Sequence, residues 1–280
     1  MSKTQIIISA GAILLIIGIF LLPKVVVDNS ADAEVASSGE VAPNAPSQSP
    51  EVEAVHNAQI SPEDEILLNT LRENYKSNVD NEKSAIFADS LAAVFKQYNK
   101  LDSAAKYYAI AAEKVPSQEA LLKAGNTYFE AYTYAVTPER SQQLGEKARE
   151  YYEIVLGQEG GEAILDVKAN LAMTYIASAD PMKGIALLRE ILDKDPNHKG
   201  AIFNLGVLSI QSNQYDRAIE RFEQLVGLDP ENVQAQFYLG LSYFEAGRKT
   251  MAKKQFEKVK TLDSDPEIQA AADGYLEEIQ

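Results

Sequence analysis

Residues 201–230 read AIFNLGVLSIQSNQYDRAIERFEQLVGLDP, and residues 235–264 read AQFYLGLSYFEAGRKTMAKKQFEKVKTLDS. The two stretches share their small, aromatic and apolar positions at an offset of 34 residues. The matched positions are Leu205-Gly206 with Leu239-Gly240, Ala218 with Ala252, and Phe222 with Phe256, and the same step leads back to Leu171-Ala172, Gly184 and Leu188. A fixed period of this length indicates that one supersecondary unit is stacked on copies of itself.

Each unit is predicted to be a pair of helices. Within residues 201–213, small and apolar residues recur at helical spacing on one face, and Asn213-Gln214 marks a turn. A second apolar face follows in residues 218–225. Pro230 ends this second helix because proline lacks the amide hydrogen that a helix interior needs. The repeated Gly and Ala positions are expected where the two helices cross closely.

These residues resemble the tetratricopeptide-repeat family, whose signature is W-x2-L-G-x2-Y, then A-x3-F, then P. The matching stretches are Leu239-Gly240-x-x-Tyr243 with Ala252-x3-Phe256; Leu205-Gly206 with Ala218-x3-Phe222 and Pro230; Leu171-Ala172-x-x-Tyr175 with Gly184, Leu188 and Pro196; and Leu91-Ala92-x-x-Phe95 with Ala104, Tyr108 and Pro116. No repeat contains the tryptophan of the signature, which indicates a divergent member.

A fifth unit departs from the signature. Gly125-x-x-Tyr128 is followed by Ala148 and Tyr152, so the Gly-to-Ala spacing is 23 residues instead of 12. Thr137-Pro138-Glu139 is a good helix start, with a capping threonine and a proline at the first helical position. This unit is therefore predicted to have a longer second helix.

The resemblance implies an all-α fold, a right-handed superhelical solenoid of about five helix-turn-helix repeats over residues 85–266. A solenoid needs covered ends. Ser61-Pro62-Glu63-Asp64 is a capping-box start, so residues 61–84 are expected to form an N-terminal capping helix. Residues 267–280 are expected to form the C-terminal one.

The first part of the chain has a different character. Residues 6–22 are an uninterrupted run of apolar and small residues, flanked by Lys3 and Lys24. At about 1.5 Å per residue this run spans roughly 26 Å, close to the thickness of a bilayer core. The alternative is a cleaved signal peptide, with Ala31-Asp32-Ala33 as the cleavage site. The length of the run and its distance from that site favour an uncleaved anchor over residues 6–27.

Residues 28–60 carry six carboxylates, three prolines and no Lys or Arg, which predicts a disordered acidic linker. The predicted order of segments is a short cytoplasmic tail at 1–5, the transmembrane anchor at 6–27 and the linker at 28–60. Because positive charge stays on the cytoplasmic side, Lys3 and the α-amine place the N-terminus there. In a bacterium the chain would be a single-pass inner-membrane protein with periplasmic repeats. A cytoplasmic solenoid is the alternative.

The composition excludes several kinds of chemistry. A net charge of −15 argues against nucleic acid, which needs clustered Lys and Arg. The chain has no cysteine, and His56 and His198 have no partner spaced for metal or nucleophilic chemistry. Residues 193–204 lack the glycine and the glutamate of a calcium loop. We therefore expect no catalytic residue, no cofactor, no metal and no small-molecule substrate.

What remains is a surface for other proteins or peptide segments. In the family that the chain resembles, the first helix of each repeat lines a concave groove. Carried over residue by residue, the resemblance implies a protein-binding groove of Asn170, Met173, Phe203, Asn204, Val207, Ile210, Phe237, Tyr238, Leu241 and Phe244. Asn170 and Asn204 correspond to asparagines that bind a peptide backbone in the family, since a side-chain amide offers a donor and an acceptor. The alternative is that these aromatic residues pack between helices.

The functional hypothesis is a membrane-anchored interaction scaffold that assembles, chaperones or recruits envelope proteins. A regulatory or accessory subunit of an enzyme complex is the alternative.

Overall fold

The computed structural model describes residues 59–161 and 164–279, and the regular elements in these two ranges are helices without a strand. They are α3 (Pro62–Ser77), α4 (Asn81–Gln97), α5 (Leu101–Lys114), α6 (Gln118–Thr133), α7 (Pro138–Leu156), α8 (Leu165–Ile176), α9 (Pro181–Lys194), α10 (Lys199–Gln211), α11 (Tyr215–Leu228), α12 (Val233–Glu245), α13 (Lys249–Leu262) and α14 (Pro266–Ile279). The predicted all-α class is confirmed for this part of the chain.

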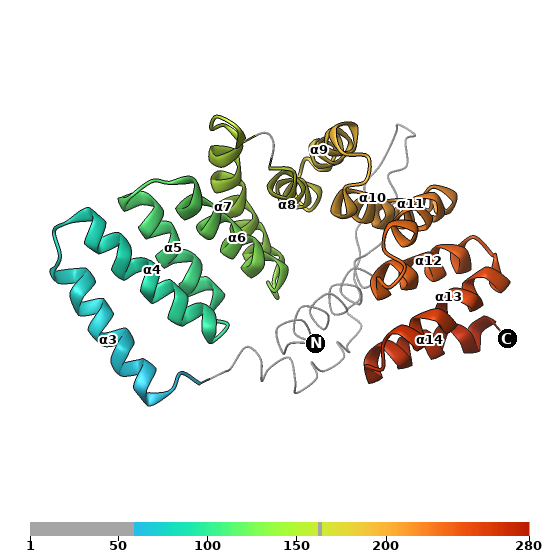
Figure 1. Ribbon diagram of the computed structural model, residues 1–280, viewed down its shortest axis with the longest axis horizontal. Coiled ribbons are helices and arrows are strands. Elements are labelled where there is room, and N and C mark those ends of the chain that lie inside the picture. Colours follow the sequence, from blue (N-terminus) through green and yellow to red (C-terminus); the bar gives the residue numbers. More distant parts are fainter. Residues whose placement is uncertain (1–58, 162–163, 280) are drawn as a thin grey trace, which may run out of the picture.

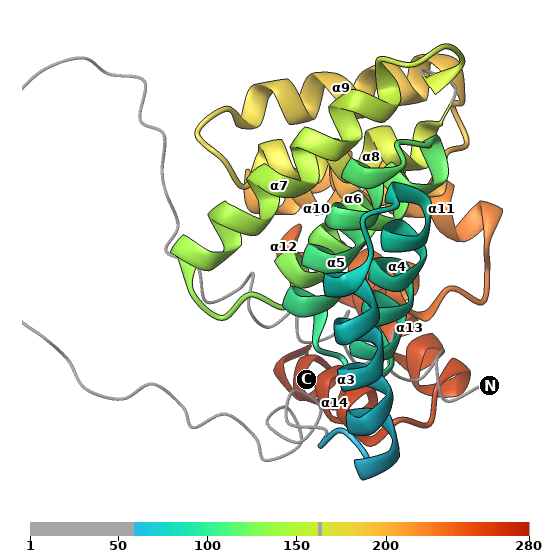
Figure 2. The same cartoon turned by 90° about the vertical axis from the view of Figure 1, so that its left-hand side faces the viewer.

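The helices follow one another around an arch, with α3 at one end and α14 at the other (Figure 1). Each helix packs mainly on the helices before and after it, so that α4 to α13 form five successive pairs. Figure 2 views the arch from the α3 end. In Figure 1, α6 and α8 lie on the inner side of the arch, with α7 and α9 outside them. The predicted stack of five helix pairs is confirmed, and the right-handed sense of the superhelix stays a prediction.

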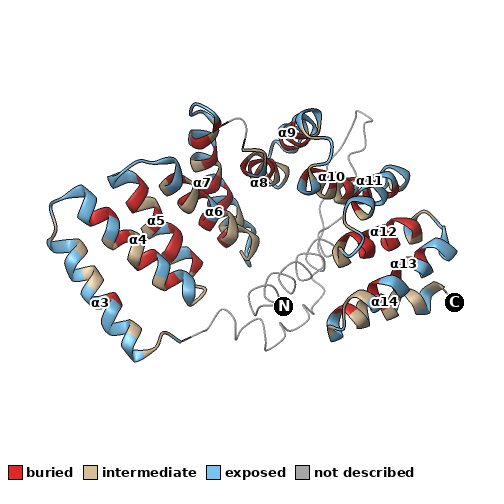
Figure 3. Cartoon of the chain, in the orientation of Figure 1, coloured by how far each residue is buried: buried red, intermediate tan, exposed pale blue. Residues whose placement is uncertain are grey.

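Buried residues occur on helices all along the arch (Figure 3), and their side chains form a row of clusters. The largest cluster joins α10 to α14, and another joins α5 to α8. A smaller cluster connects α8, α9 and α10 between them. This is the packing of a repeat protein, in which each unit is stabilised by its neighbours.

The repeated glycine of the first helix marks the place where a ring of the second helix lies against it. A Cβ atom at Gly206 would lie 2.7 Å from Cζ of Phe222, and one at Gly240 would lie 3.0 Å from Cε1 of Phe256. Both rings are fully buried. Glycine therefore recurs here because any side chain would occupy the volume of the ring.

In the third repeat, different residues allow the two helices to approach closely. Ala172 stands at the glycine position, and Leu188 takes the place of the ring. The glycine has moved to the second helix, where a Cβ atom at Gly184 would lie 2.4 Å from the backbone oxygen of Ala172. The backbones of α8 and α9 therefore approach each other at this point without room for a methyl group.

α7 is longer than the other second helices. It has 19 residues, whereas α9, α11 and α13 have 14 each. The Thr137 side chain accepts a hydrogen bond from the backbone N–H of Arg140 at 3.3 Å, and Pro138 is the first helical residue. The predicted long helix and its cap are both confirmed.

α3 begins at the predicted cap. The Ser61 hydroxyl accepts a hydrogen bond from the backbone N–H of Asp64 at 3.1 Å. The Ser61 N–H donates to the hydroxyl of Tyr98 at 3.2 Å, and that hydroxyl donates to the Asp64 carboxylate. In a capping box the side chain of the third helical residue accepts a hydrogen bond from the backbone N–H of the cap residue. Here the hydroxyl of Tyr98, at the end of α4, accepts that hydrogen bond and passes it on to Asp64.

The chain leaves the helical conformation earlier than predicted. α3 ends at Ser77, and Asp80 caps α4 by accepting a hydrogen bond from the backbone N–H of Lys83. The range expected for the N-terminal capping helix, 61–84, therefore includes the first turn of the next helix. An aspartate side chain favours a helix start over a helix interior.

α14 closes the other end of the stack by a change of residue type. Gly274 stands one period after Gly240, but a Cβ atom there would meet nothing within 4 Å. Asp273 and Glu277 stand where α12 has a leucine and a tyrosine. Asp273 pairs with Lys260 of α13 and Glu277 is exposed, so α14 carries charge at positions where α12 has buried side chains.

The predicted tail 1–5, the anchor 6–27 and the linker up to residue 58 lie outside the described residues. In the two ranges that the structure describes, no helix combines the length and the hydrophobicity needed to span a bilayer.

Candidate protein-binding groove

The ten groove residues come from three first helices, α8, α10 and α12. Because the helices repeat every 34 residues, the side chains form columns along the stack. The columns are Asn170, Asn204 and Tyr238; Met173, Val207 and Leu241; Phe203 and Phe237; and Ile210 and Phe244. The structure divides these ten residues into a buried and a half-exposed set.

Four of the ten are core residues, which corrects the predicted site. Ile210, Phe237, Tyr238 and Leu241 are exposed by only 9%, 8%, 4% and 0%. The Phe237 ring lies 5.8 Å from that of Tyr275 on α14, and the Tyr238 ring lies 5.2 Å from that of Phe203 on α10. The next helix on each side therefore covers them, and they do not present a surface to a partner.

The other six remain half-exposed. They are Asn170, Met173, Phe203, Asn204, Val207 and Phe244. The Phe203 ring lies 5.8 Å from that of Phe222 as well as close to Tyr238, and the Phe244 ring lies 5.3 Å from that of Tyr275. Part of each ring therefore stays available beside the two asparagines.

The two asparagines differ in their hydrogen bonding. The Asn170 amide donates to the hydroxyl of Tyr152 at 3.4 Å, and this hydroxyl donates to Asn126 at 2.9 Å. Burial raises the pKa of Tyr152 far above its ordinary value, so the hydroxyl stays a donor. The Asn204 side chain has no hydrogen-bond partner among the described residues. Asn204 therefore offers its whole amide to a ligand.

The first helices at the other end of the arch carry charge instead. Lys123 on α6 pairs with Asp89 on α4 at 2.8 Å, and Lys96 on α4 pairs with Glu130 on α6 at 2.7 Å. The hydrogen bond that Lys123 donates to Asp89 raises the pKa of Lys123. Sequence reasoning missed these pairs, although lysines and carboxylates at a 34-residue step, 89 with 123 and 96 with 130, were a usable signal.

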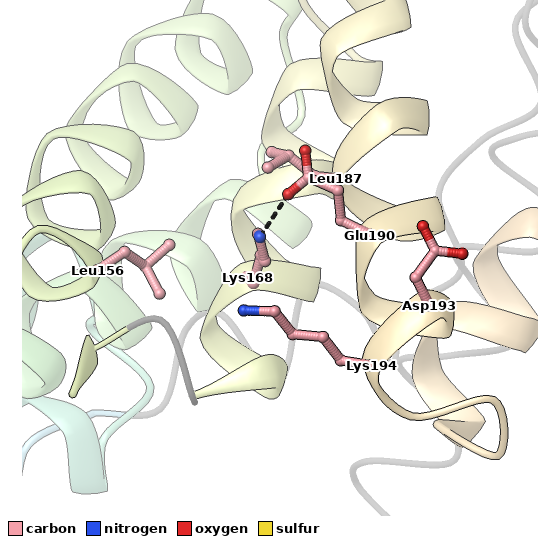
Figure 4. A pocket seen from close by; sticks show the side chains of 6 residues that line it. All are labelled: Leu156, Lys168, Leu187, Glu190, Asp193 and Lys194. Atoms are coloured by element: carbon pink, nitrogen blue, oxygen red, sulfur yellow. Dashed lines mark hydrogen bonds and ion pairs between the residues drawn. The ribbon is translucent and has the colours of Figure 1, made fainter.

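Two hollows lie at the second helices. The larger, of about 570 Å³, is lined by Leu156, Lys168, Leu187, Glu190, Asp193 and Lys194 (Figure 4). Lys168 and Glu190 form an ion pair at 2.5 Å across its wall. The smaller, of about 440 Å³, lies between α11, α12 and α13. No cluster of three metal-ligating side chains occurs within the described ranges.

Models of the tetratricopeptide repeat match residues 175–226 and residues 208–266, which run from the end of α8 to the start of α14. Residues 175–266 are tetratricopeptide repeats. The glycine, alanine and aromatic positions that mark the helix crossings in its fourth and fifth pairs are those of the family signature.

Solved structures share the arrangement of helix pairs. The crystal structure of TTC0263, a thermophilic tetratricopeptide-repeat protein of Thermus thermophilus, has a TM-score of 0.51 at 16% identity and covers 69% of this chain and 98% of that one. MamA from Desulfovibrio magneticus has a TM-score of 0.48 at 16% identity, covering 64% and 94%. YrrB, described as having an unusual peptide-binding site, has a TM-score of 0.44 at 20% identity, covering 74% and 96%. No curated protein is significantly similar to the chain in sequence.

Proposed function

We propose that this tetratricopeptide-repeat protein is a membrane-anchored interaction scaffold that binds a segment of a partner protein on α8, α10 and α12. The observation that supports the proposal is the set of half-exposed residues on these first helices. Asn170 with Asn204, and Met173 with Val207, recur at the repeat step, and these side chains are not buried in the core. Repeat proteins commonly bind their partners on such extended walls.

The chemistry of this wall fits a peptide. The Asn204 amide donates to and accepts from one peptide unit of an extended chain, which has both groups to offer. Val207 and Met173 supply apolar contact beside it, and the exposed part of Phe203 supplies anchor area. We therefore expect a ligand segment that combines free backbone hydrogen-bonding groups with one or two apolar side chains.

A photo-crosslinking amino acid tests the wall directly. Placed at Met173, it should capture a partner in membranes that contain the full-length protein. The same group at Glu220, which is exposed on α11, should not capture that partner. Val207→Asp should abolish capture from Met173 because it puts a charge on the apolar part of the wall. Equal capture from Glu220, or capture unaffected by Val207→Asp, would move the binding surface elsewhere.

The membrane part of the proposal rests on residues 6–27 and on the charges around them. We propose an uncleaved single-pass anchor in a bacterial inner membrane, with the N-terminus in the cytoplasm and the repeats in the periplasm, where they serve envelope proteins. The absence of cysteine allows a clean test. A single cysteine at the exposed position Thr70 should react with a membrane-impermeant maleimide in cells whose outer membrane is permeable. Protection of that cysteine until the inner membrane is lysed would reverse the topology.

A further inference from the structure

Among the described helices, α13 has the largest positive net charge. α13 contains five lysines and one glutamate, although the whole chain has a net charge of −15. Lys260 pairs with Asp273 of α14. Four lysines are left, Lys249, Lys253, Lys254 and Lys258; all four are exposed, and none has an ion-pair or hydrogen-bond partner among the described residues. We name these four the lysine face.

The lysine face borders a hollow. The space of about 440 Å³ between α11, α12 and α13 is lined by Lys254 and Lys258 together with Val226, Gln236 and Thr261. Glu257 also lines it. A narrow ligand lying along this hollow would meet two ammonium groups from α13 and an apolar side chain from α11.

The spacing of the lysines suits an extended acidic segment. Lys249 and Lys253, like Lys254 and Lys258, are four residues apart on a helix, which separates them by about 6 Å along its axis. Alternate residues of an extended chain are about 6.6 Å apart and point to the same side. Two carboxylates at positions i and i+2 of an extended segment therefore match either pair of lysines.

The chain contains an acidic segment with carboxylates at this spacing. Residues 28–58 carry six carboxylates and neither Lys nor Arg, and both Asp32-x-Glu34 and Glu51-x-Glu53 have the required spacing. α3, the first described helix, and α13 lie toward opposite ends of the arch (Figure 1). Glu51 and Glu53 are only about six residues from the start of the described helices, too few to reach α13. About 25 residues separate Asp32 and Glu34 from the same point, and a chain of that length can span up to roughly 80 Å. The length of the chain therefore favours Asp32 and Glu34.

An anionic membrane surface fits the lysine face less well. α14 packs against α13 and carries four carboxylates and no basic residue. A flat layer of anionic headgroups would meet these carboxylates as well as the lysines, and the two contributions oppose each other. A single extended segment on α13 avoids α14.

We propose that the acidic segment 28–58 binds the lysine face of α13, with Asp32 and Glu34 on one of its two lysine pairs. The contact ties the C-terminal end of the arch to the segment that follows the apolar run. The contact lies on a second helix and not on the wall of α8, α10 and α12. This proposal can therefore be tested separately from the proposed partner site.

Zero-length carbodiimide cross-linking tests this contact, because the reagent joins an amine to a carboxylate only when the two touch. The full-length protein in a zwitterionic detergent should give peptides that link a lysine of the lysine face to Asp32 or Glu34. These links should fall at least about fivefold in half-molar salt, where the Debye length is about 4 Å. The link between Lys123 and Asp89, at 2.8 Å, is the internal control and should persist.

Charge reversal gives the matched comparison. Lys254→Glu with Lys258→Glu should reduce the links made by Lys249 and Lys253 to the segment by a similar factor. Lys106→Glu with Lys114→Glu, which reverses two exposed lysines of α5, should leave those links unchanged. Mixing isotope-labelled and unlabelled chains then shows whether the segment comes from the same chain or from a second copy.

Two results would overturn the proposal. One is that the lysine face links only to carboxylates within the described helices, such as Glu257 or those of α14. The other is that links to the segment disappear when the zwitterionic detergent is supplemented with anionic phosphatidylglycerol, which would make lipid headgroups the preferred ligand of the lysine face.

Discussion

Replacing Gly184 by alanine should destabilise the protein even though the other repeats favour alanine at this position. The next two repeats have Ala218 and Ala252 at the same step of 34 residues. Alanine is also the better helix former by about 1 kcal/mol. A comparison of repeats alone therefore predicts that Gly184→Ala stabilises α9. The structure predicts the opposite, because the added Cβ would lie 2.4 Å from the carbonyl oxygen of Ala172 and 2.7 Å from Cγ1 of Ile176.

The size of the effect follows from what the methyl group meets. The carbonyl oxygen belongs to the backbone of α8, so it cannot rotate away as a side chain could. α8 and α9 must move apart by about 1 Å to restore ordinary contact, and overpacking of this kind costs about 1–3 kcal/mol. After subtraction of the gain in helix propensity, about 1 kcal/mol, we expect a net loss of up to about 2 kcal/mol. In a protein of this size that lowers the Tm by up to roughly 8 °C.

Urea unfolding followed by circular dichroism measures the change, with Gly274→Ala as the matched control. A Cβ atom at Gly274 would meet nothing within 4 Å, so this variant isolates helix propensity and should be stabilised by about 1 kcal/mol. If Gly184→Ala is as stable as Gly274→Ala, the close approach of α8 and α9 is wrong. A loss at Gly184 together with a gain at Gly274 would establish that the third repeat has the tighter crossing.

Three further predictions concern other parts of the fold. Ala218→Phe should overpack a fully buried position at a cost of about 1–3 kcal/mol, and an unchanged Tm would show that the helices of the fourth repeat cross elsewhere. Thr137→Ala should cost about 0.5–2 kcal/mol by removing the cap of α7, whereas Thr137→Ser should restore most of it; equal Tm values for the two variants would argue against the cap. Burial raises the pKa of Tyr151 and of Tyr243 to about 12, so the folded state favours their protonated forms. The stabilisation that this gives is complete below about pH 10 and is lost as the pH rises from 10 toward 12, with stability and tyrosinate absorbance measured together; titration of every tyrosine near pH 10 would contradict it.

The helix pairs could be predicted from sequence because the positions that repeat are those that touch. Gly206 recurs as Gly240, and Phe222 recurs as Phe256, for the single reason that each ring occupies the space beside its glycine. The long α7 could be predicted for a local reason, since Thr137-Pro138 is a helix start whatever surrounds it. The missed break before α4 also had a local signal, the Asp80 cap.

The groove was harder to predict because exposure depends on the next helix. Phe237 and Leu241 occupy the wall positions of the fifth pair, but α14 brings Tyr275 against that wall. The equivalent positions Phe203 and Val207 in the fourth pair stay half-exposed. A periodic sequence predicts the same exposed surface in every repeat. In the fifth pair, however, α14 covers part of that surface. The ion pairs between α4 and α6 form in the same way, between residues a whole repeat apart.

The polar face of α14 has a consequence for the length of the array. Asp273 and Glu277 stand in place of the buried Leu239 and Tyr243 of α12, and a Cβ atom at Gly274 would meet nothing within 4 Å. We therefore expect a few side chains of α14 to decide whether a further helix can pack on it, and these are not the residues that stabilise the preceding repeats. Restoring Leu and Tyr at 273 and 277 and appending a copy of residues 249–262 after a suitable turn should therefore grow the array by one repeat. Because the residues that stabilise each repeat differ from those that make α14 polar, repeats can be duplicated during evolution without a change in α14.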